Sequence, residues 1–135
     1  MLRRFESYRF HQWKGARVGI TQEKGDVGLV HAISDFTEMG YYVSIPITES
    51  AQYDLIVDDK SNIYKVQVKY STSGMVDLRR IHSNSTGYQI KLYEENAFNW
   101  LYVYVPGDGS YLIKEVFSNI KSIKVKEKYR INLDS

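Results

Sequence analysis

The sequence centres on Gln52-Tyr-Asp-Leu-Ile-Val-Asp-Asp-Lys-Ser-Asn-Ile-Tyr-Lys-Val-Gln-Val-Lys-Tyr70, in which two apolar runs flank a turn-rich segment. The stretch is predicted to form a β-hairpin, because apolar runs bounded by Asp, Asn and Ser are typical of strands joined by a turn. Asp54 stands at the start of the first strand. Gln67 and Lys69 are two residues apart on the second strand, so they share one of its faces. The hairpin therefore brings a carboxylate, an amide and an ammonium group to one end of a small sheet.

This grouping suits a divalent cation beside a phosphate group. Oxygen atoms are the ligands that Mg²⁺ prefers, and an ammonium group stabilises negative charge on a phosphate. The alternative is that Asp54, Gln67 and Lys69 are ordinary polar residues on a solvent-facing strand. In an arbitrary hairpin the second interpretation is the commoner one, so the residue types alone leave both open.

A helix is predicted before the hairpin. Thr21-Gln-Glu-Lys24 combines a capping residue with an acidic first turn, which is a helix-start signal. Gly40 stands where a glycine commonly ends a helix. Between these two signals, apolar residues recur at helical spacing at Val27, Val30, Ile33 and Phe36.

The rest of the chain is predicted to be rich in strands. We expect them at residues 41–47, 53–57, 63–70, 88–93, 100–105, 111–114 and 123–125. Pro46 favours a sheet edge for the first of them. Residues 71–85, rich in Ser, Thr, Gly, Asn and Arg, are expected to leave the sheet, and residues 1–20 to form a basic arm. The order predicts one α/β domain over residues 1–135, with a helix on one face of a mixed sheet.

The composition is that of a folded protein. Hydrophobic residues make up 43% of the 135 residues and charged residues 25%, as in an ordinary globular domain. The absence of cysteine excludes disulfides and thiolate metal sites, and it favours an intracellular, cytoplasmic location. We expect no membrane span, since no run of about 18 apolar residues is present. The N-terminal residues lack the apolar segment of a secretion signal.

Charge is distributed unevenly, although the net charge is only +2. Residues 1–20 contain five Lys or Arg and one Glu, and residues 114–135 contain six Lys or Arg and three acids, so the centre is net acidic. Basic ends around an acidic centre fit a polyanion held by the ends over a cation-binding core. Scattered surface charge is the alternative, and the charge alone does not decide between the two.

Several motifs along the chain resemble one family of nucleases. They are Lys24-Gly-Asp-Val-Gly28, Gly40-Tyr-Tyr-Val, Pro46, Tyr53-Asp-Leu-Ile-Val-Asp58, Val66-Gln-Val-Lys-Tyr70 and Asn99-Trp-Leu-Tyr-Val-Tyr104. Together they resemble the PD-(D/E)XK nucleases, and within them the branch that includes intron-encoded homing endonucleases, where Gln often replaces the second acid. The resemblance implies a restriction-endonuclease-like core, with a mixed β-sheet, an N-terminal core helix and a β-rich C-terminal half.

The resemblance also implies an activity, namely that of a Mg²⁺-dependent, site-specific endonuclease of the homing type. It would hydrolyse phosphodiester bonds of double-stranded DNA. Asp54 would hold Mg²⁺, Gln67 would direct its carbonyl oxygen to the cation or orient a water beside it, and Lys69 would stabilise the developing anion. The cation would acidify the attacking water and polarise the phosphoryl group. Because cutting both strands requires two active sites, we expect a homodimer or homotetramer.

The predicted helix departs from the family pattern. Relatives place a Glu near the position of Leu29, and leucine cannot bind a cation. Asp26 lies three residues earlier on the same helical face and is the candidate replacement ligand. Its alternative role is to pair with the helix dipole. Without Asp26 the site has a single acid, which is the arrangement expected of a weakly active or inactive nuclease.

DNA contacts are expected from two basic segments, which would reach phosphates and base edges. The candidates are Arg79, Arg80 and His82 within an excursion over residues 71–98, and Lys14 and Arg17 in the N-terminal arm. The alternatives are a solvated loop for the first segment and a frayed arm for the second.

Two other functions fit the same residues. A Holliday-junction-resolving nuclease of the same fold would cut branched DNA rather than a defined sequence. A catalytically silent DNA-binding module would keep the fold without the chemistry, which Leu29 and Gln67 favour. The histidines at His11, His31 and His82 lack the spacing of a metal site.

Overall fold

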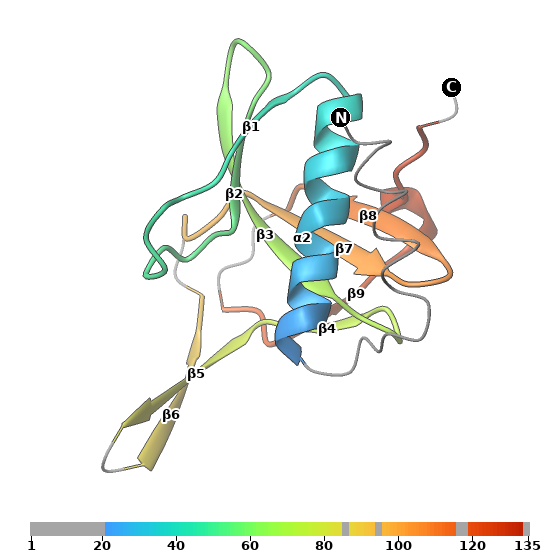
Figure 1. Ribbon diagram of the computed structural model, residues 1–135. Coiled ribbons are helices and arrows are strands. Elements are labelled where there is room, and N and C mark those ends of the chain that lie inside the picture. Colours follow the sequence, from blue (N-terminus) through green and yellow to red (C-terminus); the bar gives the residue numbers. More distant parts are fainter. Residues whose placement is uncertain (1–20, 85–86, 94–95, 116–118, 134–135) are drawn as a thin grey trace.

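The structure is a computed structural model that describes residues 21–84, 87–93, 96–115 and 119–133. The predicted arm at residues 1–20, with Lys14 and Arg17, lies outside the described residues. A five-stranded sheet forms the centre of the fold, and the long helix α2 (Thr21–Glu38) lies across one of its faces (Figure 1). This arrangement confirms the predicted α/β fold with a helix on a mixed sheet.

Strands make up most of the chain after α2. In chain order they are β1 (Tyr42–Ser44), β2 (Leu55–Asp58), β3 (Ile63–Tyr70), β4 (Met75–Asp77), β5 (Arg79–Asn84), β6 (Gly87–Leu92), β7 (Trp100–Val105), β8 (Gly109–Ile113) and β9 (Ser122–Lys124), followed by a short 3-10 helix, η1 (Glu127–Tyr129). The five-stranded sheet has the order β1-β2-β3-β7-β8. Its pairs are antiparallel except for β3 and β7, which run parallel. The sheet is therefore mixed, as predicted.

The predicted hairpin is confirmed by the pairing of β2 with β3. Leu55 lies opposite Val66, and Asp58 lies opposite Ile63. β1 occupies the edge of the sheet, as Pro46 predicts. It ends at Ser44, however, so it is shorter than the strand expected at residues 41–47.

Residues 71–85 leave the central sheet as expected, but they form strands that the sequence analysis missed. β4 pairs with β9, and β5 pairs with β6, in two separate two-stranded sheets. The strand predicted at residues 88–93 is β6, which belongs to this second pair rather than to the central sheet.

The described part of the helix runs from Thr21 to Glu38, and the helix ends with a glycine cap, as predicted. Gly40 has φ +93°, a conformation that glycine adopts without strain. Its N–H donates to the carbonyl of Thr37 at 3.1 Å, and the N–H of Tyr41 donates to the carbonyl of Phe36 at 3.0 Å. These two bonds satisfy carbonyls that the end of a helix leaves without partners. Among the described residues, no helix is long and apolar enough to cross a membrane.

One face of α2 packs directly on β3. A Cβ atom placed on Gly28 would lie 3.5 Å from Cγ1 of Val68 and 3.7 Å from Cβ of Tyr70, so the helix backbone approaches the strand closely there. Further along the helix, Ala32 and Phe36 are fully buried in a core that also contains Val66 and Tyr102. Every second residue of β3 therefore faces the helix, and the residues between them face the opposite side.

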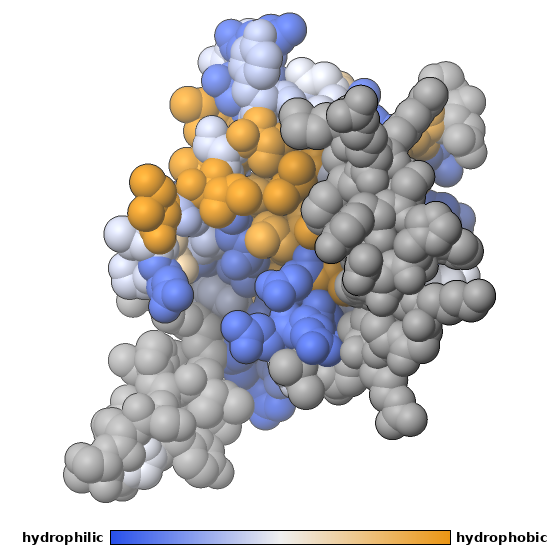
Figure 2. Space-filling model, in the orientation of Figure 1, coloured by the Kyte–Doolittle hydropathy of each residue, from blue (hydrophilic) through white to orange (hydrophobic). Residues whose placement is uncertain are grey.

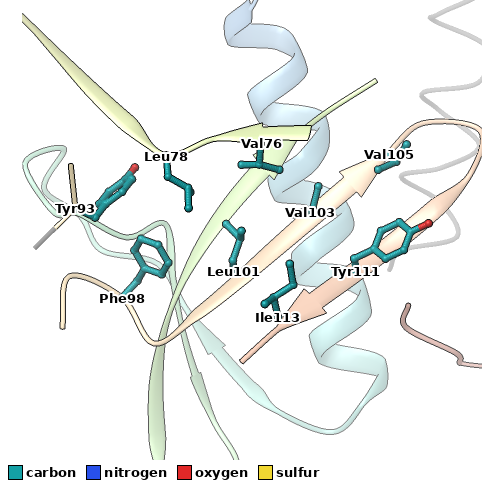
Figure 3. Close-up of a cluster of buried hydrophobic side chains, with 9 residues drawn as sticks. All are labelled: Val76, Leu78, Tyr93, Phe98, Leu101, Val103, Val105, Tyr111 and Ile113. Atoms are coloured by element: carbon teal, nitrogen blue, oxygen red, sulfur yellow. The ribbon is translucent and has the colours of Figure 1, made fainter. Parts of the chain in front are cut away.

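The opposite face of the sheet carries a second core (Figure 3). Val76 and Leu78, at and after β4, pack there against Leu101 and Val103 of β7 and Ile113 of β8. A short turn directs the chain to this position. It is stabilised by Ser71, whose hydroxyl donates to the carbonyl of Met75 at 2.6 Å and accepts from the N–H of Gly74 at 3.0 Å. The chain thus returns over the face of β3 that points away from α2.

Replacing Phe36 with Ala is expected to lower the free energy of unfolding by about 3–5 kcal/mol, because it leaves a cavity between the helix and the sheet. Urea denaturation followed by circular dichroism measures the change. Val30→Ala is the matched control: Val30 lies on the same helix but is 36% exposed, and a change below about 0.5 kcal/mol is expected there. Equal losses in the two variants would contradict the packing described here.

Candidate active site

Asp54, Gln67 and Lys69 lie on the face of the sheet opposite α2. The backbone N–H of Asp54 donates to the carbonyl of Val66 at 2.9 Å, which extends the pairing of β2 with β3 by one residue. Asp54 consequently lies beside Gln67. The amide Nε2 of Gln67 donates to Oδ2 of Asp54 at 2.9 Å. The structure therefore brings two of the three predicted residues into direct contact.

The same carboxylate completes the backbone pairing of β3. β2 starts beside Val66, so the N–H of Val68 lies past the end of the partner strand. Oδ2 of Asp54 accepts a hydrogen bond from that N–H at 2.8 Å. Because a half-buried backbone N–H without a partner is costly, Asp54 has a structural role at this point of the sheet. Its second oxygen, Oδ1, accepts no hydrogen bond from the residues that the structure describes.

Lys69 joins this pair through charge. Burial raises the pKa of the Asp54 carboxyl, and the Val68 N–H and the Lys69 ammonium lower it by smaller amounts. Burial lowers the pKa of Lys69, and the charges of Asp54 and Asp77 oppose that effect. The Lys69 ammonium lies 5.9 Å from the ring centre of Tyr93, within the range of a cation–π interaction. A partly desolvated anion and a partly desolvated cation thus stabilise one another on this face.

The donor set fits a divalent cation. A carboxylate is an acceptor only, so it is the NH₂ group of Gln67 that faces Asp54, and the amide oxygen is directed elsewhere. One carboxylate oxygen and one amide oxygen are hard ligands suited to Mg²⁺, which keeps several waters when it binds protein. Two residues before Asp54 in the sequence, Gln52 has a buried side-chain oxygen, Oε1, without a hydrogen-bond partner among the described residues. Burial raises the pKa of Asp54 because it disfavours the charged form, and a bound cation would stabilise that charged form.

The structure does not bring Asp26 to this group. Asp26 is exposed on α2, two residues before Gly28, so it points away from the strand on which Gly28 packs. Figure 2 shows hydrophilic residues over this N-terminal half of α2, with apolar residues gathered nearer its C-terminal half and β1. Leu29 is half-buried in the core between helix and sheet and is not a ligand.

Two nearby acids have the structural roles expected of turn residues. Oδ1 of Asp58 accepts from the N–H of Lys60 at 2.7 Å, and Oδ1 of Asp59 accepts from the N–H groups of Ser61 and Asn62 at 2.9 and 2.6 Å. Across the described part of the chain, no group of three or more histidine or acidic side chains lies close enough to bind a metal. A cation at Asp54 would accordingly depend on amide oxygens, water and substrate.

The predicted DNA-contacting residues lie on a hairpin next to this group. β5 and β6 form a two-stranded ribbon that projects from the body of the fold (Figure 1). Arg79 is its first residue and is exposed. Arg80 pairs in register with Lys91, and His82 pairs with Gln89. The hairpin begins two residues after Asp77, an acid whose negative charge opposes the lowering of the Lys69 pKa by burial.

Sequence reasoning missed Asp77 and Tyr93 as neighbours of Lys69. Asp77 lies eight residues after Lys69 in a segment without clear periodicity, and Tyr93 follows the hairpin. Only the turn at Ser71 and the burial of Val76 bring the first of them back to β3. No local pattern in the sequence could have identified either one.

Comparisons with known proteins agree with this geometry. The sequence matches the model of the PD-(D/E)XK endonuclease family over residues 20–132. A search of curated protein sequences finds no match. Among solved structures, the fold is similar to that of a bacterial homing endonuclease, I-Ssp6803I, with a TM-score of 0.70 and 30% sequence identity over 81% of this chain and 80% of that chain. The fold and the family predicted from the motifs are therefore confirmed: the chain belongs to the PD-(D/E)XK endonuclease family and is a nuclease.

Proposed function

We propose that the protein is a Mg²⁺-dependent, site-specific DNA endonuclease of the homing type. The observation that carries the proposal is the group formed by Asp54, Gln67 and Lys69 on the face of β3 opposite α2. It combines a carboxylate oxygen that accepts no hydrogen bond from the described residues, an amide oxygen and an ammonium group. These are the groups that phosphodiester hydrolysis requires for holding a cation and stabilising phosphate charge.

Each residue has a separate part in the proposed reaction. Asp54 and Gln67 would hold the cation, and the hydrogen bond between them fixes both side chains before substrate arrives. The cation, when bound, supplies polarisation of the phosphoryl group and a lowered pKa for water. Water attacks the phosphorus in line with the leaving oxygen, and negative charge grows on the phosphoryl oxygens. Lys69 stabilises this charge with an ammonium that burial has already partly desolvated.

DNA binding is assigned to the hairpin and to basic residues around it. A two-stranded ribbon fits the major groove, where base edges are distinguishable. Arg79, Arg80 and His82 on β5 would contact DNA there, and Lys14 and Arg17 would bind the backbone. Similarity to a homing endonuclease supports a defined target site. Cutting both strands of such a target requires two active sites, which supports a homodimer or homotetramer.

Asp54→Asn is expected to reduce plasmid nicking by at least about a hundredfold while leaving the fold intact, because asparagine can accept the Gln67 and Val68 hydrogen bonds but carries no charge for the cation. Initial rates of nicking on supercoiled plasmid carrying the target measure the loss. Asp58→Asn is the matched control, since it changes a half-buried acid in the turn at the other end of β2, and it should cut normally. Full activity of Asp54→Asn would exclude this active site, and an inactive wild type that still binds DNA would favour a silent module.

Gln67→Ala is expected to raise the Mg²⁺ concentration for half-maximal nicking by about tenfold or more, because both an amide ligand and the support of Asp54 are lost. EDTA should abolish nicking by the wild type, and added Mg²⁺ should restore it. A magnesium titration of nicking rates measures the shift. Cleavage that persists in EDTA would refute the proposed metal dependence.

The nicking rate at subsaturating Mg²⁺ is expected to follow a narrow bell-shaped pH profile. Asp54 must be ionised, and its raised pKa moves the acidic limb above the ordinary range for aspartate. Lys69 must be protonated, and its lowered pKa moves the alkaline limb below the ordinary range for lysine. Lys69→Arg should move only the alkaline limb, to higher pH, because arginine stays protonated. An unchanged alkaline limb in an active Lys69→Arg variant would exclude Lys69 as the group that titrates.

A further inference from the structure

Asp77 and Arg79 form an ion pair at the base of the hairpin. Nη2 of Arg79 donates to Oδ2 of Asp77 at 2.8 Å, and Nε donates to Oδ1 at 3.0 Å, so one edge of the guanidinium faces the carboxylate. The backbone N–H of Arg79 also donates to Oδ1, at 2.8 Å. The backbone N–H of Arg79 thus anchors the carboxylate, and the carboxylate holds the guanidinium through two hydrogen bonds, which gives the side chain a defined orientation at the protein surface.

The backbone beneath this ion pair is fixed. Leu78, between the two residues, is fully buried, and its N–H donates to the carbonyl of Lys121 at 2.9 Å. Val76, one residue before Asp77, is buried in the same core (Figure 3). Both side chains of the pair nevertheless remain about half exposed, at 48% for Arg79 and 55% for Asp77. A rigid base therefore presents the pair to solvent, where a ligand can reach it.

The pair lies next to the candidate active site. The Lys69 ammonium lies 5.9 Å from the ring centre of Tyr93, and Tyr93 belongs to the same buried cluster as Val76 and Leu78, the two neighbours of Asp77 in the chain. The four groups alternate in charge from Asp54 through Lys69 and Asp77 to Arg79. A DNA strand whose phosphate lies at Lys69 would pass Arg79 as it continues toward the hairpin.

The hydrogen bonds of Arg79 leave part of its donor set unused. A guanidinium has five N–H donors in a planar fork, and the carboxylate of Asp77 uses the edge formed by Nε and Nη2. Nη1 donates to no residue that the structure describes. An exposed arginine loses rotamer freedom when it binds a phosphate, and an arginine already held in place loses less.

We propose that Asp77 is a positioning residue for DNA binding, which orients Arg79 so that the N–H groups of its Nη1 atom bind a backbone phosphate beside the one at Lys69. The inference rests on the proposed function and deepens it, because it assigns the contact at which the hairpin and the active site share one DNA strand.

The direction in which DNA affinity changes when Asp77 is neutralised separates this positioning role from simple repulsion between Asp77 and DNA. An acid beside a polyanion weakens binding through charge, so neutralising it ordinarily tightens the complex. The positioning role predicts the opposite for Asp77→Asn: the loss of a fixed Arg79 outweighs the loss of one negative charge.

The test measures binding of a short, fluorescein-labelled, random-sequence DNA duplex by anisotropy in EDTA, where no cutting occurs. Asp77→Asn is expected to weaken binding by about threefold to tenfold, and Arg79→Ala by about tenfold with a salt dependence reduced by about one ion. In the Arg79→Ala background, Asp77→Asn should produce no further weakening. Glu38→Gln, at the exposed C-terminal end of α2, is the control for removing one acid and should leave binding equal or slightly tighter.

Arg79→Lys provides a second variant, because lysine keeps the charge but cannot form the paired hydrogen bonds. It should bind nearly as weakly as Arg79→Ala. Wild-type affinity in Arg79→Lys, or unchanged or tighter binding in Asp77→Asn, overturns the proposal, as does weakening that persists without Arg79. Plasmid nicking by the wild type in Mg²⁺ is measured in parallel. If the wild type cuts and Asp77→Asn binds normally, only this inference fails; if the wild type neither binds nor cuts DNA, the proposed function fails with it.

Discussion

The carboxylate of Asp54 has two roles: it completes the hydrogen bonding of the sheet and it belongs to the candidate active site. β2 begins one residue after Asp54, and the N–H of Val68 on β3 would face no partner strand there. Oδ2 of Asp54 accepts that N–H and the amide of Gln67 together. One oxygen of the side chain therefore has a structural role, and the other is left for a ligand. The cost is a half-buried negative charge, visible in the raised pKa of Asp54, and the nearby ammonium of Lys69 offsets part of it.

The two faces of β3 separate packing from reactivity. Val66, Val68 and Tyr70 face α2, and the close approach of the helix at Gly28 holds this side of the strand in place. Gln67 and Lys69, between them in sequence, face the other side. A shift of one residue in the pairing of β2 with β3 would reverse both faces. The burial of Leu55, opposite Val66, opposes such a shift, so the core fixes where the reactive groups lie.

The features predicted correctly from the sequence are those that depend on the spacing of residues close together in the chain. The hairpin, the helix with its cap at Gly40, and the shared face of Gln67 and Lys69 all follow from spacing over a few residues. β4 was missed because three residues, Met75–Asp77, are too few to show a period, and their position depends on a turn at Ser71 and on a partner, β9, distant in the chain. Asp77 was missed for the same reason. Asp26 was chosen because it shares a helical face with Leu29, but burial of that face extends only to Leu29, and Asp26 lies at its solvent-exposed end.

The hairpin of β5 and β6 is an insertion between two neighbouring strands of the central sheet. It is inserted in the crossover that joins the parallel strands β3 and β7, and within the described part of the chain its strands pair only with each other. Buried residues on either side, Leu78 and Tyr93, fix the ends of this insertion. Lengthening or replacing such a segment has a small effect on loop-closure entropy. Evolution, or an engineer grafting a different ribbon between these two anchors, can thus exchange the outer segment while the strands that carry Asp54 and Lys69 remain as they are.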